Sequence, residues 1–205
     1  MRNAVYPLFA SPIMVCGEPF AFRAPEEAFL AELPMVRNVG NAMSRDDRVL
    51  DAPELARLRA FVDREVSTYA HRLWRIRADL EVYVTQSWVN RAGPGEFHAR
   101  HRHPNSIVSG VLFLDDDPHE ALPPITFHRP QEPFPLQLDY DELDELNASA
   151  RTFEVVRGRL ILFPSLLEHD VGPNDSERTR STLSFNTFVR GVAGRRDALT
   201  EVRLS

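Results

Sequence analysis

Three histidines within six positions are the first residues whose type and spacing indicate chemistry. His98, His101 and His103 precede an apolar, β-branched run at 107–114. Imidazole is the commonest metal ligand in proteins and is largely neutral near physiological pH. His101 and His103, at i and i+2, point to one side of an extended segment, whereas His98 has the opposite parity. The spacing predicts a metal site that contains His101 and His103, with His98 aimed away from it.

A second segment supplies a further ligand candidate and a polar strand. His169 lies just beyond a buried strand expected at 160–163, and another strand is expected at 180–189. The second strand alternates polar and apolar residues, which puts a polar row on one face. That row is Arg180, Thr182, Ser184 and Asn186. A sheet with one solvent-facing side gives the same pattern, but the arginine that closely follows His169 favours a strand lining a wet pocket.

Taken together, these motifs resemble the Fe(II)/2-oxoglutarate-dependent dioxygenase superfamily. The closer resemblance is to a small microbial branch of 2OG-Fe(II) oxygenases with an H-x-H motif. The matching segments are SWVN (87–90), HRHPNSIVSGVLFL (101–114), GRLILFPSLLEH (158–169) and RSTLSFN (180–186). The resemblance covers most of the chain, with a gap at about 129–151.

The resemblance implies an enzyme that uses Fe(II), 2-oxoglutarate and O2. It implies hydroxylation of an unactivated C–H bond with release of succinate and CO2. The iron ligands that it implies are His101, His103 and His169. The planar fork of an arginine suits the distal carboxylate of the co-substrate. The residues expected to contact that co-substrate are Arg180, Thr182, Asn90 and Ser109. Trp88, two residues before Asn90 on the same strand face, is either a pocket wall or core.

One residue departs from the superfamily pattern, because most members have a carboxylate where this chain has His103. Three neutral imidazoles leave an iron site one unit more positive than two imidazoles and a carboxylate, which either tightens binding of an anionic co-substrate or alters the chemistry. Two alternatives stay open: a three-histidine, cupin-like dioxygenase without 2-oxoglutarate, and a non-catalytic metal-binding jelly roll. Arg180 and Thr182 favour the 2-oxoglutarate-dependent oxygenase over the cupin-like dioxygenase, which has no need of a co-substrate arginine at that place. A triad of His98, His101 and His169 also stays open.

Composition limits the other function classes. A chain of 205 residues with 43% hydrophobic content is long enough for one domain with a core. A net charge of −6 argues against nucleic-acid binding. The single cysteine, Cys16, excludes an internal disulfide and suits a reducing compartment, and no apolar run reaches transmembrane length. We therefore expect a cytoplasmic enzyme that acts on a small-molecule or peptide substrate, without a membrane partner; the oligomeric state stays open.

The expected fold is mainly β: a double-stranded β-helix (jelly roll, cupin-like) after a helical N-terminal third. Helices are expected at 25–33 and 53–76, the second capped by Asp51. The remaining strands are expected at 81–90, 106–114, 125–128 and 153–156, the last paired with 160–163. Residues 38–47 are expected to form a loop. The single domain, 1–205, is expected to divide into an N-terminal part (1–79) with an extended segment at 6–15 and the helices, a jelly-roll core (80–190) with an insertion at 129–151, and a tail (191–205).

Overall fold

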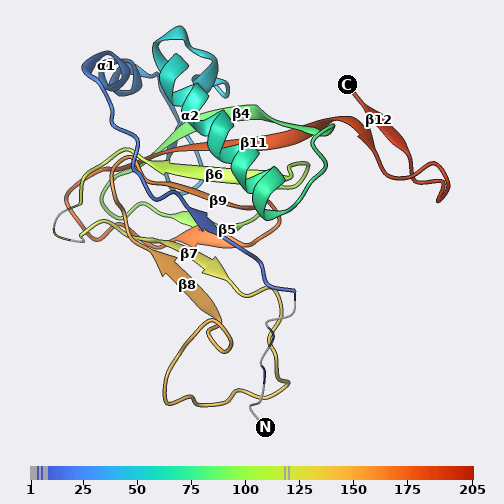
Figure 1. Ribbon diagram of the computed structural model, residues 1–205. Coiled ribbons are helices and arrows are strands. Elements are labelled where there is room, and N and C mark those ends of the chain that lie inside the picture. Colours follow the sequence, from blue (N-terminus) through green and yellow to red (C-terminus); the bar gives the residue numbers. More distant parts are fainter. Residues whose placement is uncertain (1–3, 5, 7–8, 118, 120) are drawn as a thin grey trace.

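Two antiparallel sheets face each other in the computed structural model, which describes residues 4, 6, 9–117, 119 and 121–205 (Figure 1). The larger sheet has the order β1-β9-β6-β11-β4-β3-β2, with β12 added to β11, and the smaller has the order β5-β10-β7-β8. The strands of the larger sheet are β1 (Met14–Val15), β2 (Met35–Arg37), β3 (Ala42–Ser44), β4 (Glu81–Ala92), β6 (Val108–Phe113), β9 (Leu160–Pro164), β11 (Arg180–Ala193) and β12 (Val202–Leu204). Those of the smaller are β5 (His98–His101), β7 (Ile125–His128), β8 (Ala150–Phe153) and β10 (His169–Val171).

The expected pairing of 153–156 with 160–163 is wrong. β8 pairs with β7 in the smaller sheet, where Phe153 lies opposite Ile125, and β9 pairs with β6 and β1 in the larger sheet. The chain between β8 and β9 passes from one sheet to the other, with Val155 buried in the core between them. Local turn signals at Arg157 and Gly158 mark this crossing and not a hairpin.

The N-terminal third is not helical throughout, because β1, β2 and β3 belong to it and join the larger sheet. β3 lies inside the expected loop at 38–47. The helices are α1 (Ala24–Glu32) and α2 (Ala56–Ser67), with short 3-10 turns η1 (Val49–Asp51) and η2 (Pro53–Leu55) before α2 and a π-helical segment η3 (Thr68–Leu73) after it. Asp51 does not cap α2; its carboxylate pairs with Arg59 instead.

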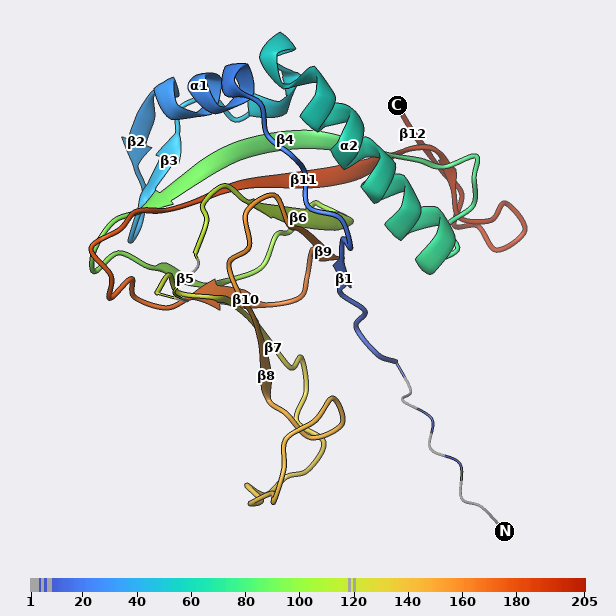
Figure 2. The same cartoon turned by 60° about the vertical axis from the view of Figure 1, so that its left-hand side comes forward.

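α2 lies across the outer face of the larger sheet (Figure 2). Its buried side chains Leu58, Val62 and Val66 pack in one core cluster with Leu183 and Phe185 of β11. A second cluster fills the space between the two sheets. The larger sheet is therefore covered on both faces. α2 packs on the outer face, and the inner face of the sheet supplies one wall of the site described below.

Gly110, in the middle of β6, lies against the ring of Phe185 on the neighbouring strand. A Cβ at this position would overlap that buried ring. We expect Gly110→Ala to lower the free energy of unfolding by about 1–3 kcal/mol, since an overpacked core must shift its neighbours. Urea unfolding measures the difference. Gly17→Ala is the matched control, because a Cβ at Gly17 meets no atom within 4 Å; equal stability of the two variants would contradict this reading.

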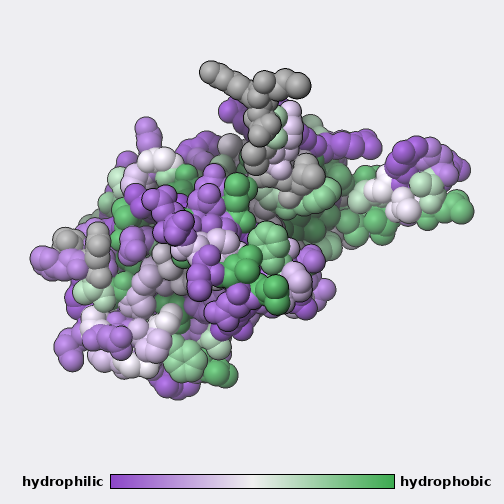
Figure 3. All heavy atoms as spheres, turned by 90° about the horizontal axis from the view of Figure 1, so that it is seen from below, coloured by the Kyte–Doolittle hydropathy of each residue, from purple (hydrophilic) through white to green (hydrophobic). Residues whose placement is uncertain are grey.

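The insertion between β7 and β8 projects away from the two sheets (Figures 1 and 2). Its base is closed by Arg129, whose Nε donates to the carbonyl oxygen of Ala148 at 2.8 Å. Large apolar side chains along it are exposed: Phe134, Leu136, Leu138, Tyr140, Leu143 and Leu146. Figure 3 shows the molecule from the side of this insertion, with hydrophobic residues interspersed among hydrophilic ones. Among the described residues, no helix combines the length and apolar character that crossing a membrane requires.

Candidate metal centre

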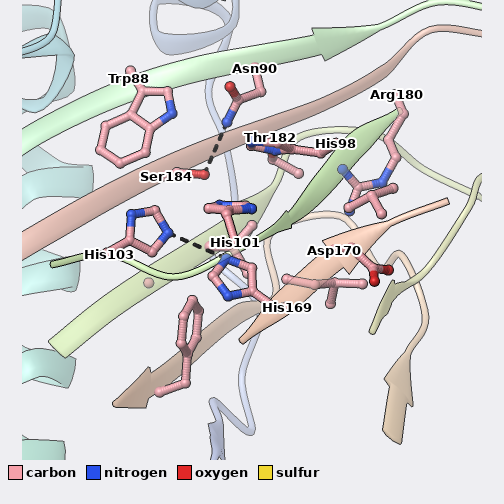
Figure 4. A pocket seen from close by; sticks show the side chains of 15 residues that line it. Trp88, Asn90, His98, His101, His103, His169, Asp170, Arg180, Thr182 and Ser184 are labelled. Atoms are coloured by element: carbon pink, nitrogen blue, oxygen red, sulfur yellow. Dashed lines mark hydrogen bonds between the residues drawn. The ribbon is translucent and has the colours of Figure 1, made fainter. Parts of the chain in front are cut away.

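Three histidine rings meet between the sheets because of strand pairing and one backbone hydrogen bond. His101 ends β5 and lies directly opposite His169 of β10. His103 follows two residues later, and its backbone N–H donates to the carbonyl oxygen of Ser165 at 2.8 Å. One ring nitrogen from each histidine lies within 4.8 Å of the other two, and this is the metal-binding group found among the described residues (Figure 4). No carboxylate belongs to that group.

Hydrogen bonds to backbone carbonyls orient two of these rings. Nδ1 of His101 lies 2.7 Å from the Ala99 carbonyl oxygen, and Nδ1 of His169 lies 3.0 Å from that of Leu167. A Nδ1–H that donates to a carbonyl leaves the Nε2 lone pair free for a metal. Nε2 of His169 lies 3.3 Å from Nε2 of His103. Nitrogens bonded at about 2.1 Å to one metal, at right angles, would be about 3 Å apart, so the arrangement fits a shared ion.

Burial keeps the rings of His103 and His169 neutral. Desolvation, helped by neighbouring histidines, lowers the pKa of His103 to about 3 and that of His169 to about 4. Trp88, with its ring centroid 5.9 Å from that of His103, and Phe163, at 4.8 Å from His169, form part of the apolar surroundings. A neutral imidazole keeps the lone pair that a metal needs.

His98 is the residue that strand parity placed wrongly, because its ring lies in the cavity and not away from it. β10 has His169 opposite His101 and Val171 opposite His98, so between these pairs one residue on β10 faces two on β5. Such a bulge reverses the alternation of side chains. The rings of His98 and His101 stack at 4.3 Å and 19°. Burial, followed by the charges of His101, His169 and Arg180, lowers the pKa of His98 to about 3.

The inner face of the larger sheet supplies the polar wall of the same cavity. Thr182 of β11 lies opposite Asn90 of β4, and Ser184 lies opposite Trp88. Nδ2 of Asn90 donates to the Ser184 hydroxyl at 3.3 Å, while Oδ1 of Asn90 is buried and has no partner among the described residues. All four side chains line the cavity, whose volume for the centres of water-sized spheres is about 30 Å³. Trp88 is thus a wall of the site and not core.

Arg180 places a buried cation at the end of that wall. Its side chain is 5% exposed, Nε donates to the Pro123 carbonyl oxygen at 2.9 Å, and Nη2 has no hydrogen-bond partner among the described residues. Burial lowers its pKa to about 10, and Asp115 opposes the shift, so the guanidinium is charged at neutral pH. A buried charge with an unsatisfied donor is costly. A carboxylate in the cavity would neutralise this charge and accept one or two hydrogen bonds from the guanidinium.

Ser109 is the predicted co-substrate contact that the structure does not bring to the cavity lining. Its hydroxyl donates to Oδ1 of Asn186 at 2.8 Å and lies 2.9 Å from the Ser165 hydroxyl. The carbonyl of Ser165 is the one that accepts from the His103 backbone. The Ser109 side chain therefore holds the segment that carries His103.

Asp170 is a cavity-lining residue that the sequence did not single out. Although it follows His169 directly, its carboxylate lies 2.6 Å from Nε2 of His128 on β7. The Asp170 carboxylate is thus engaged by His128 and does not belong to the group formed by His101, His103 and His169. Only the strand register, which no local motif reveals, brings the two side chains together.

Comparisons with known proteins agree with this geometry. The model of a family described as "Putative 2OG-Fe(II) oxygenase" matches residues 86–186. An oxidoreductase of the 2OG-Fe(II) oxygenase family from Burkholderia pseudomallei is 17% identical with a TM-score of 0.60, over 85% of this chain and 83% of that one. A prolyl-4-hydroxylase from Pseudomonas putida is 17% identical with a TM-score of 0.58, over 90% and 96%. The 2-oxoglutarate-dependent (alpha ketoglutarate) epimerase SnoN of nogalamycin biosynthesis is 16% identical with a TM-score of 0.60, over 87% and 76%.

At these identities the structural likenesses show the fold, a double-stranded β-helix, and no particular reaction. The search of curated proteins found no match.

Proposed function

Since this chain belongs to the family of 2OG-Fe(II) oxygenases and its cofactors are Fe(II) and 2-oxoglutarate, we propose that it hydroxylates an unactivated C–H bond of a small-molecule or peptide substrate. Succinate and CO2 are the products formed from 2-oxoglutarate. When bound, the iron supplies activation of O2 coupled to oxidative decarboxylation. The contribution of the protein is to hold the metal, orient the co-substrate and exclude water.

His101, His103 and His169 are the proposed iron ligands. Their support is the convergence of one ring nitrogen from each within 4.8 Å and the two Nδ1 contacts to backbone carbonyls. Three ligands on one face of a metal leave adjacent positions for a bidentate co-substrate and O2. The apolar rings of Trp88 and Phe163 limit the access of water to this face.

The observation that carries the proposal is the buried guanidinium of Arg180, whose Nη2 has no hydrogen-bond partner among the described residues. A metal-only site has no need for a buried cation with a free Nη2 facing the same cavity as the histidines. 2-Oxoglutarate suits both parts of the cavity: its keto acid suits the metal held by the histidines, and its distal carboxylate suits the guanidinium of Arg180. A three-histidine oxygenase without a co-substrate would leave the arginine unsatisfied.

Thr182 and Asn90 are proposed as additional co-substrate contacts. Both are buried on the inner face of the larger sheet, directly opposite each other in the β4–β11 pair. A carboxylate only accepts hydrogen bonds, so it needs the Thr182 O–H and an amide N–H. Rotating the Asn90 amide exchanges its oxygen and nitrogen, which are assigned from the hydrogen-bond network. The rotated amide accepts from the Ser184 hydroxyl and puts Nδ2 in the place of the unpartnered Oδ1.

Anaerobic titration tests this function. Protein loaded with Fe(II) and titrated with 2-oxoglutarate is expected to develop the visible charge-transfer band of the metal–keto-acid chelate. Admission of O2, with ascorbate present, is expected to yield succinate slowly even without a substrate. Protein without iron is the control. An iron-loaded protein that gives neither the band nor succinate would instead be a three-histidine oxygenase of the cupin type or a non-catalytic metal binder.

A further inference from the structure

We propose that His98 is a co-substrate-positioning residue whose ring N–H donates a hydrogen bond to 2-oxoglutarate between the metal and Arg180. The inference rests on the proposed function. It adds a residue from the smaller sheet to a binding site whose other proposed contacts, Arg180, Thr182 and Asn90, all lie on the larger sheet.

The bulge between β5 and β10 is what brings His98 into the cavity. Without it, His98 would face the opposite side of β5 from His101. With it, the two rings stack in nearly parallel planes, 4.3 Å apart. Figure 4 labels His98, Thr182, His101 and Arg180 around one cavity, and both His101 and Arg180 are close enough to His98 for their charges to lower its pKa. A molecule that reaches from the histidine group to Arg180 therefore passes the ring of His98, which lines the same cavity.

The hydrogen-bonding edge of His98 is available for this role. Its stack on His101 uses the face of the ring and not its edge. The rings of His101 and His169 are tied to backbone carbonyls, whereas the ring of His98 makes no hydrogen bond in the described part of the chain. An uncharged imidazole carries one N–H, and both carboxylates of 2-oxoglutarate accept hydrogen bonds. A half-buried donor without a partner and an acceptor-rich ligand are complementary.

The distances between ring nitrogens argue against His98 as a metal ligand. The described histidines whose ring nitrogens come within 4.8 Å of one another are His101, His103 and His169, and His98 is not in this group.

Two substitutions separate the hydrogen bond from the stack. His98→Phe keeps a flat ring on His101 but removes the N–H; His98→Gln keeps an N–H donor but removes the ring. Iron per chain is measured by metal analysis after anaerobic reconstitution, and the affinity of the Fe(II)-loaded protein for 2-oxoglutarate by calorimetry. We expect both variants to retain iron. We expect His98→Phe to bind 2-oxoglutarate about 10- to 100-fold more weakly, and His98→Gln to recover most of the loss.

The control variant is His119→Phe, which changes an exposed histidine outside the cavity lining. Unchanged 2-oxoglutarate affinity in His98→Phe would overturn the inference and leave the proposed function intact. Loss of iron from both His98 variants would also overturn it, by making His98 a ligand. Failure of the wild-type, iron-loaded protein to bind 2-oxoglutarate would refute the proposed function itself, and the inference with it.

Discussion

Replacing His103 with Ala is expected to remove most of the iron from the reconstituted protein, whereas His98→Ala keeps it. The His103 ring is one of the three that converge, and its Nε2 lies 3.3 Å from that of His169. Loss of a residue that merely supports a ligand typically costs 10- to 100-fold in metal affinity, so we expect the loss of a ligand to cost more than about 100-fold. Metal analysis after anaerobic reconstitution gives iron per chain for both variants.

A third variant tests the departure from the superfamily pattern. His103→Asp is expected to recover iron binding at least in part, because an oxygen ligand restores two histidines and one carboxylate on one face of the metal. The backbone bond from residue 103 to Ser165 is available in every variant, so the segment keeps its position. Full iron occupancy in His103→Ala, together with loss in His98→Ala, would make His98, His101 and His169 the triad.

Arg180→Ala is expected to retain iron and to lose most of the affinity for 2-oxoglutarate. A hydrogen bond to a charged group contributes about 1.5–3 kcal/mol, and about 1.4 kcal/mol corresponds to a factor of ten. A loss of about 10- to 100-fold is therefore the minimum, because the distal carboxylate would also be left buried without a partner. Arg180→Lys is expected to recover only part, since an ammonium keeps the charge but not the planar fork. Calorimetry on the Fe(II)-loaded protein measures each affinity.

Arg190→Ala is the matched control for Arg180→Ala. Arg190 lies on the same strand, β11, but is exposed and paired with Glu81. Because Arg180 is buried, thermal unfolding of each variant establishes that it is folded before binding is measured. An unchanged 2-oxoglutarate affinity in folded Arg180→Ala would remove this arginine from the binding site.

The sequence predicts those parts of the fold that local patterns encode. The alternation at 180–189 predicts β11 and its polar inner row, because a strand has a period of two. The continuous apolar run at 160–163 predicts β9 as a short, fully buried strand. Strands β2 and β3 are missed, since three residues are too few to show a period. β3 forms on the edge that β4 provides, and β2 pairs with β3.

The candidate site likewise contains residues that local motifs identify and residues whose placement depends on strand register. The H-x-H motif and the arginine that follows His169 identify residues that the structure brings to one cavity. The orientation of His98 and the pairing of Asp170 with His128 escape prediction because both depend on register between strands distant in the chain. The hydroxyl of Ser109 escapes it for the same reason, since its partner Asn186 comes from β11. Residue types are local information, while the direction of a side chain across a bulge is not.

The division of the cavity between the two sheets has a consequence for cooperativity. His101 and His169 belong to the smaller sheet, whereas Arg180 and Thr182 belong to the larger. In the proposed complex, 2-oxoglutarate is thus a non-covalent tether between two layers of the core. A ligand that binds only the closed arrangement stabilises it in proportion to the logarithm of its concentration. The co-substrate then opposes, above all, those partial openings of the molecule that separate one sheet from the other.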